Sequence, residues 1–167
     1  MKSTDSGIKH FTISENSINN FIAGTTSDRK TVAMNELGKL DSENKTVYIT
    51  DPYLFCGSAH DPDYERDLAL ILKHLKAAKI VYCASSIQDQ QLFQNICNDL
   101  AKQNCQLIHD SKLTDCHDRF WYCSDTNKAV VFGTSFNGLC KKICRVDLLK
   151  EEETDELNKE LKIRGIV

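Results

Sequence analysis

Residues 116–144, CHDRFWYCSDTNKAVVFGTSFNGLCKKIC, mark the place where the pattern of the chain changes. DRFWYC (118–123) and KAVVF (128–132) are rich in aromatic and β-branched residues, which favours strands, and KICRVDLL (142–149) continues the series. No helical pattern separates these runs. The stretch therefore predicts consecutive strands, and the segments before it decide what kind of sheet they join.

Upstream of this stretch, predicted strands alternate with predicted helices. The strands are KTVYIT (45–50), AKIVYCAS (78–85) and CQLIH (105–109). One helix opens at Asp61-Pro62, where an N-cap acceptor precedes a proline, and a second spans 88–103. Both have an apolar stripe, made of Tyr64, Leu68, Ile71, Leu72 and Leu75 in the first and of Leu92, Phe93, Ile96, Cys97 and Leu100 in the second. The order predicts a parallel βαβαβ core to which the later strands are added, a mixed α/β fold.

The ends of the chain give weaker patterns. Residues 1–10 are polar, FTI (11–13) predicts a short strand, and the region up to Leu40 is weakly helical, with Ala33, Leu37 and Leu40 at helical spacing. EEETDELNKELK (151–162) predicts a terminal helix that turns Leu157 and Leu161 inward and places acidic residues at its positive end.

Length and composition predict one globular domain over residues 1–167, with 41% hydrophobic and 27% charged residues. No run approaches the roughly eighteen apolar residues that cross a bilayer, and MKSTDSGIKH lacks the apolar core of a secretory signal. We therefore expect a cytoplasmic protein. Its formal net charge of −3 gives no overall attraction to nucleic acid or anionic membranes, so any phosphate binding must be local.

Eight cysteines in a chain without a secretory signal favour reduced, structural thiols. A tetrahedral zinc site built from Cys116, His117 or Cys123, Cys140 and Cys144 is a weaker alternative, because the spacing is not that of a zinc knuckle. We expect no metal and no cofactor. A cysteine–histidine nucleophile is weaker again, since no cysteine has an activating setting. We expect His74 and His109 to be surface residues.

Four polar residues within the stretch 116–144 have side chains that can bind a phosphate group. On a strand, residues two apart share a face, so His117 pairs with Arg119 and Ser135 with Asn137. Arginine can bind two phosphate oxygens, serine and asparagine can donate to others, and histidine can attack phosphorus or transfer a proton. Gly133 leaves room for close approach.

Two further residues are predicted to belong to this site, and the site residues also have structural interpretations. Asp51 and Tyr53 follow a strand at its carboxyl end, where α/β sheets place ligands, and we expect them to line the same pocket. The competing interpretations are a hydrogen-bonded strand histidine for His117 and a capped turn for Ser135 and Asn137. Trp121 and Tyr122 are predicted to be core.

These residues resemble the phospholipase D superfamily, whose signature is histidine-x-lysine followed at a distance by a glycine-serine-x-asparagine turn. His117-Asp118-Arg119 matches the first element and Gly133-Thr134-Ser135-Phe136-Asn137 the second. VYITDPYLF together with HDRF resembles more closely the phospholipase D-like domain at the C-terminus of MIT-domain proteins and its compact bacterial relatives. The resemblance extends from about Lys45 to Leu149, excludes residues 1–40, and implies a mixed sheet flanked by helices on both faces.

The resemblance implies a metal-independent phosphodiesterase in which one histidine forms a phosphohistidine and a second protonates the leaving oxygen. This chain has one such motif, and the compact relatives bring two together by forming homodimers. His117 would then be nucleophile in one subunit and acid in the other. Arg119, Ser135 and Asn137 would hold the phosphoryl group, and Asp147 would orient the histidine.

The sequence departs from the family pattern at two positions, and these departures lead to two expected functions. Arg119 replaces the family lysine, and Ser124 stands where an aspartate is usual, with Asp125 one position later. In the MIT-associated branch the His-Asp-Arg motif is associated with binding acidic lipid headgroups. The first expectation is therefore a nuclease-like phosphodiesterase with a phosphodiester substrate such as nucleic acid, and the alternative is a catalytically inactive module that binds phosphate, phosphoinositide or nucleotide. A protein-interaction scaffold would leave the phosphate-binding set unexplained.

Overall fold

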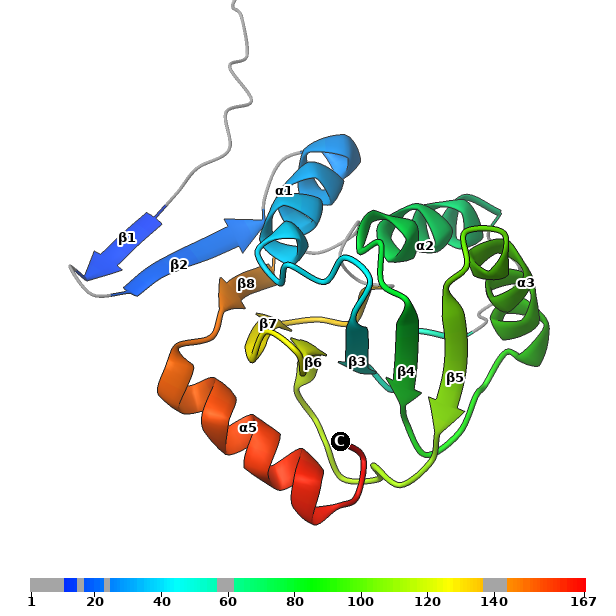
Figure 1. Cartoon of the computed structure of the whole chain (residues 1–167). Helices are drawn as coiled ribbons and strands as arrows, with labels where there is room; N and C mark the ends of the chain where they lie inside the picture. The colour runs from blue at the N-terminus through cyan, green and yellow to red at the C-terminus, as the bar shows by residue number, and fades with distance from the viewer. Residues whose placement is uncertain (1–10, 15–16, 23–24, 57–61, 137–143) are drawn as a thin grey trace, which may run out of the picture.

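The computed structural model describes residues 11–14, 17–22, 25–56, 62–136 and 144–167. Its strands form one eight-stranded sheet in the order β1-β2-β8-β7-β6-β3-β4-β5. The strands are β1 (Phe11–Ser14), β2 (Ser17–Ile22), β3 (Thr46–Thr50), β4 (Lys79–Cys83), β5 (Gln106–Asp110), β6 (Arg119–Cys123), β7 (Lys128–Phe132) and β8 (Cys144–Leu148). The helices are α1 (Thr26–Gly38), α2 (Pro62–His74), α3 (Gln90–Ala101) and α5 (Glu151–Ile163). The predicted mixed α/β fold is confirmed (Figure 1).

The sheet has a parallel part and an antiparallel part that meet at β3. β3 pairs in parallel with β4, and β4 in parallel with β5, through the crossover helices α2 and α3. On its other side β3 pairs antiparallel with β6, with Ile49 opposite Trp121, and β7 and β8 follow antiparallel. The change of pattern at residues 116–144 is therefore the point where the chain passes from β5 to the far side of β3.

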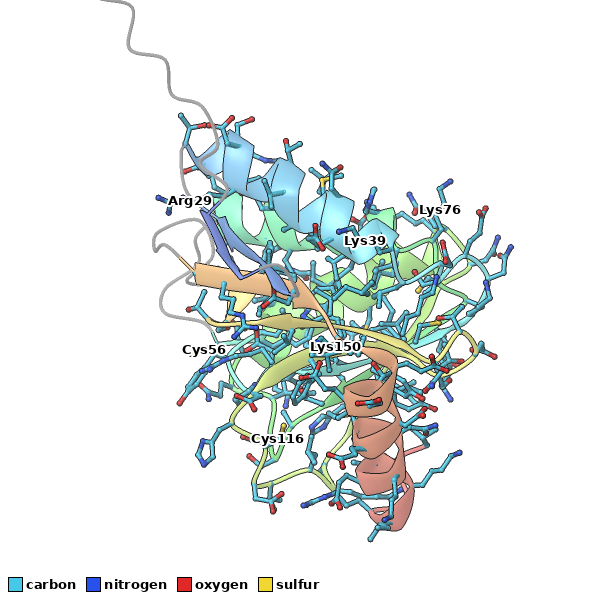
Figure 2. All side chains as sticks on the ribbon, turned by 90° about the vertical axis from the view of Figure 1, so that its left-hand side faces the viewer. Arg29, Lys39, Cys56, Lys76, Cys116 and Lys150 are labelled. Atoms are coloured by element: carbon cyan, nitrogen blue, oxygen red, sulfur yellow. The ribbon has the colours of Figure 1, made fainter. Side chains whose placement is uncertain are left out.

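Helices cover both faces of the sheet, as expected. The core of one face includes Ile49, Trp121 and Val130, and α1, α2 and α3 pack against it through residues such as Leu37, Leu72 and Ile96. The core of the other face is smaller and includes Tyr122, Ala129 and, from α5, Leu161. Trp121 and Tyr122 are each 1% exposed, which confirms that they are core residues. Figure 2 shows the two layers from the side, with α1 and α5 on opposite faces.

Three details differ from the sequence-based expectations. β2 was not predicted, because SINNFI contains two asparagines, which are rare in strands, and it forms by pairing antiparallel with β8. The weak helical pattern before Leu40 corresponds to the shorter helix α1, which a capping box of Thr25 and Asp28 opens. His109 is not a surface residue: it is half-buried, its Nε2 lies 2.7 Å from the carbonyl oxygen of Ala84, and its ring is near Tyr82.

Two further predictions, for the first residue of α2 and for His74, agree with the structure. Pro62 is the first residue of α2, although Asp61 lies outside the described residues. His74 is exposed, as expected. Among the helices that the structure describes, none has the length and apolar character needed to span a membrane. Within the same residues no three histidine, cysteine or acidic side chains gather as a metal site would require, and Cys140 lies outside them.

Candidate functional site

β3, β6 and β7 each have one end on the same side of the sheet, and we call this row of strand ends the edge. β3 ends there and leads into Asp51, and β6, which is antiparallel to β3, begins there with Arg119. β7 ends at the same edge, because Phe132 lies opposite Arg119, and the chain continues into Gly133 and Ser135. The topology therefore brings Asp51 and Ser135 to the same edge, although they lie more than eighty positions apart in the sequence.

The side chain of Asp51 joins these segments, and we call its three hydrogen bonds the Asp51 clamp. Its Oδ2 accepts hydrogen bonds from the Ser135 hydroxyl and the Phe136 N–H, both at 2.9 Å, and its Oδ1 accepts one from the Tyr53 N–H at 3.1 Å. Asp51 is 0% exposed, so the carboxylate does not reach solvent. The Ser135 hydroxyl therefore fixes the turn after β7, and its proton points at Asp51.

The pKa of Asp51 reflects this environment. Burial raises the pKa of this carboxyl above its ordinary value, and the hydrogen bonds from Phe136, Ser135 and Tyr53 oppose that rise. The guanidinium of Arg119 lies close enough to lower the pKa of Asp51 as well. Arg119 therefore stands beside the clamp and supplies a cation at this edge.

Arg119 has an unused hydrogen-bond donor. Its Nε is buried, and no described residue accepts a hydrogen bond from it. Leaving a buried donor unsatisfied costs about 1–3 kcal/mol, and structures rarely tolerate this without a reason. A planar guanidinium with a free Nε–H is well suited to bind two oxygens of a phosphate or carboxylate.

His117 lies in front of β6 and not within it. The strand begins at Arg119, so the alternation that would place His117 and Arg119 on one face does not extend to His117. The imidazole is exposed, and within the described part of the chain no hydrogen bond joins it to Arg119, Ser135 or Asp147. Residues two apart are separated by at most about 7 Å along the chain, so rotation of the His117 side chain can bring it near a group bound at Arg119.

His117 lines a groove of about 810 Å³ on the α5 face of the sheet, and we call it the α5 groove. Gly133 and Arg145 from the sheet and Leu157 from α5 also line it. Cys116 lies on this side of the sheet as well (Figure 2). His117 and Arg119 thus stand at the same edge, with the imidazole toward the α5 groove and the guanidinium toward Asp51.

Gly133 and Asp147 belong to the contact between β7 and β8. The Gly133 N–H donates to the Arg145 carbonyl oxygen at 2.8 Å, and a Cβ at Gly133 would lie 3.2 Å from the Arg145 backbone nitrogen. An added Cβ would therefore crowd the backbone of β8, whatever binds nearby. The carboxylate of Asp147 forms an ion pair with Arg145 on the same strand. Tyr53 is 47% exposed beside the clamp, and Asn137 lies outside the described residues.

The thiols near the site are not activated. Burial raises the pKa of the Cys116 thiol, whose Sγ donates to the Asp118 carbonyl oxygen at 3.3 Å. Burial also raises the pKa of Cys83 to about 12. A protonated thiol is a poor nucleophile, so these residues fit the structural role predicted for them. The role of Asp51 as an acceptor for the Ser135 turn was not predicted, because a contact between segments so distant in sequence leaves no local pattern.

Comparison with known proteins adds little to this geometry. No protein-family model matches the sequence, and no curated protein does. One similar solved structure is that of TrmBL2, described as an archaeal chromatin protein with a novel mode of DNA binding, at 10% identity and a TM-score of 0.45. The match covers 89% of this chain and 52% of the other, so this chain spans about half the length of TrmBL2.

Proposed function

We propose that this chain is a phospholipase D-like phosphodiesterase that binds its phosphate at the edge formed by Arg119 and the Gly133–Phe136 turn. The proposal rests on one observation: the buried Nε–H of Arg119 has no acceptor among the described residues and lies beside a turn that Asp51 holds in place. A phosphate oxygen would satisfy this donor. Because the turn is already fixed, the binding site would be preorganised before the ligand arrives, and binding would cost less conformational entropy.

In the proposed reaction His117 is the nucleophile. An imidazole nitrogen attacks phosphorus, the bond from phosphorus to the leaving oxygen breaks, and a second histidine protonates that oxygen. Water then attacks phosphorus and gives a proton to the second histidine, and the phosphorus–nitrogen bond breaks, which frees the phosphate product and His117. The second histidine is His117 of another copy in a homodimer, as the family resemblance implies. Arg119 stabilises the charge that develops on the phosphoryl oxygens, and nucleic acid is the first substrate to test.

The second candidate is a module that binds a phosphate without cleaving it, on an acidic lipid headgroup or a nucleotide. Two observations favour it: His117 is exposed without a bond to an orienting acid among the described residues, and arginine replaces the lysine of the family. Arginine binds phosphate strongly through its fork. In this candidate Arg119 supplies most of the affinity and His117 little.

A phosphodiesterase assay separates the two candidates. The purified protein is incubated in a chelator with bis(p-nitrophenyl) phosphate and with labelled single-stranded DNA, and vesicles with or without phosphoinositide test binding. For an enzyme, we expect turnover that falls at least about a hundredfold in His117→Ala and in Arg119→Ala. His74→Ala is the matched control, because His74 is an exposed histidine on α2.

For a binding module, we expect no turnover, a large loss of binding in Arg119→Ala and a small loss in His117→Ala. Turnover that survives in His117→Ala would contradict the enzymatic proposal. Phosphate ligands that bind equally well to the protein and to Arg119→Ala would contradict both candidates, because both depend on that guanidinium.

A further inference from the structure

The α5 groove combines an apolar floor with an acidic rim. Its floor includes Leu113 and Leu161, which are buried, and Leu149 and Leu157, which are half-buried. The half-buried leucines leave apolar surface open to a ligand. Exposed apolar surface surrounded by polar residues is typical of protein interaction sites.

The charges along the groove are unequal. The described lining residues include five carboxylates and two guanidinium groups, a balance of −3, which equals the formal net charge of the whole chain. The acids are Asp115, Asp118, Glu153, Glu156 and Glu160, and the bases are Arg145 and Arg164. The rest of the chain is therefore neutral on balance, and the negative charge is concentrated at this groove.

Both guanidinium groups already have partners. Arg145 pairs with Asp147, and Arg164 pairs with Asp115 and Glu160. In contrast, Glu156 and Asp118 have no ion pair within the part of the chain that the structure describes. The field that a ligand meets in the groove is thus set by carboxylates.

Helix α5 presents its acids and leucines in adjacent rows. Glu153, Glu156 and Glu160 lie on one side of the helix at helical spacing, and Leu157 and Leu161 follow one position later, toward the sheet. Glu151 and Glu152 are exposed on the same helix but do not line the groove. A ligand along α5 would therefore meet apolar and acidic contacts side by side.

We propose that the α5 groove binds a basic, amphipathic segment of a partner protein, with apolar side chains on the leucine floor and lysine or arginine side chains on the acidic row. Charge complementarity selects this occupant, because a nucleic acid or anionic lipid that lay along the acidic row of α5 would be repelled, whereas the proposed phosphate site is at Arg119, which does not line the groove. A symmetric contact made along α5 would place the equal acidic rows of two copies against each other. The proposal does not depend on phosphodiester cleavage.

Fluorescence anisotropy with a labelled peptide tests the proposal. The probe is an amphipathic peptide of leucine and lysine, and the control probe has glutamate in place of lysine. We expect the lysine peptide to bind, with an affinity that falls as salt is added, and the glutamate peptide not to bind. The variant Glu156→Lys/Glu160→Lys is expected to weaken binding about tenfold or more.

Glu151→Lys/Glu152→Lys is the matched control, because it makes the same charge change on the same helix outside the groove. We expect it to keep binding within about threefold of the unchanged protein. An equal loss in both double variants would overturn the proposal, and so would failure of the lysine peptide to bind. Sedimentation tests the other occupant: self-association abolished by Glu156→Lys/Glu160→Lys would assign the groove to a second copy.

Discussion

At the scale of single residues, Asp51 connects the fold to the candidate site. A carboxylate that is 0% exposed is costly unless it is well hydrogen bonded, and the Asp51 clamp gives it three donors. The same contacts fix the turn beside Arg119. In the proposed function, Asp51 acts on the phosphate only through the position of that turn and the charge of Arg119, because its own side chain does not touch solvent.

Asp51→Asn should destabilise the protein by about 1–3 kcal/mol, because both carboxyl oxygens accept hydrogen bonds and the amide would put an N–H donor in place of one of them. The size of this loss should depend on pH. The folded-state pKa of Asp51 is raised above its ordinary value of 3.8, so its contribution to stability is full below that value and falls as pH rises through the folded pKa. The free-energy difference between the two proteins, from urea unfolding, should therefore be larger near about pH 4 than near about pH 7.

Other carboxylates titrate in both proteins and cancel in this difference. Burial raises the pKa of Asp51, and the hydrogen-bond donors of the clamp and the guanidinium of Arg119 lower it. A difference that grows as pH rises would mean that Asp51 is better stabilised as an anion than its burial indicates.

At the scale of elements, the junction of β7 and β8 shows how a sheet contact sets a residue type. Gly133 leaves β7 where the backbone of β8 passes, and the Arg145 nitrogen would be 3.2 Å from an added Cβ. Backbone atoms cannot move aside as a flexible side chain can. The motif glycine is therefore explained by the sheet itself.

Gly133→Ala should destabilise the protein by about 1–3 kcal/mol through this crowding. Gly38→Ala in α1 is the matched control, because its Cβ would meet the His74 side chain at an ordinary 3.8 Å. The control should stabilise the helix by up to about 1 kcal/mol, since alanine is the better helix former. Thermal unfolding of both variants measures the contrast, and equal effects would show that the β7–β8 contact is looser than described.

Most elements could be predicted because each has a local pattern. β-branched runs predicted β3, β4 and β7, and apolar stripes predicted α2 and α3, within a few residues of their bounds. β2 could not be predicted, because pairing with β8 from the opposite end of the chain forms it. At the site, the residues Arg119 and Ser135 were identified by motif, whereas the bond between Ser135 and Asp51 depends on tertiary structure.

At the scale of the whole molecule, the two helical layers enclose cores of unequal size. The thiols follow these layers: Cys83, Cys105, Cys123 and Cys144 are buried, whereas Cys56, Cys97 and Cys116 are half-buried. Burial raises the pKa of Cys144 to about 11 and that of Cys83 to about 12. Reactivity toward thiol reagents therefore reports on how well both layers are packed.

Alkylation with iodoacetamide at about pH 8, followed by mass spectrometry, should modify the half-buried Cys56 first and the four buried thiols only after unfolding in urea. The expected ratio of rates is at least about a hundredfold, because alkylation requires both access and a thiolate. Labelling of Cys123 as fast as that of Cys56 in the folded protein would contradict the packing around β6.

The pairing of β2 with β8 has a consequence for how this chain is made. A ribosome releases β2 long before β8, and β3 must likewise wait for β6 before its second neighbour exists. The early βαβαβ part can gather as it emerges, but its open flank at β3 stays unprotected until β6 has been made. Assembly of the finished sheet is thus governed by slow, long-range closure, and chaperone demand should be greatest during that interval.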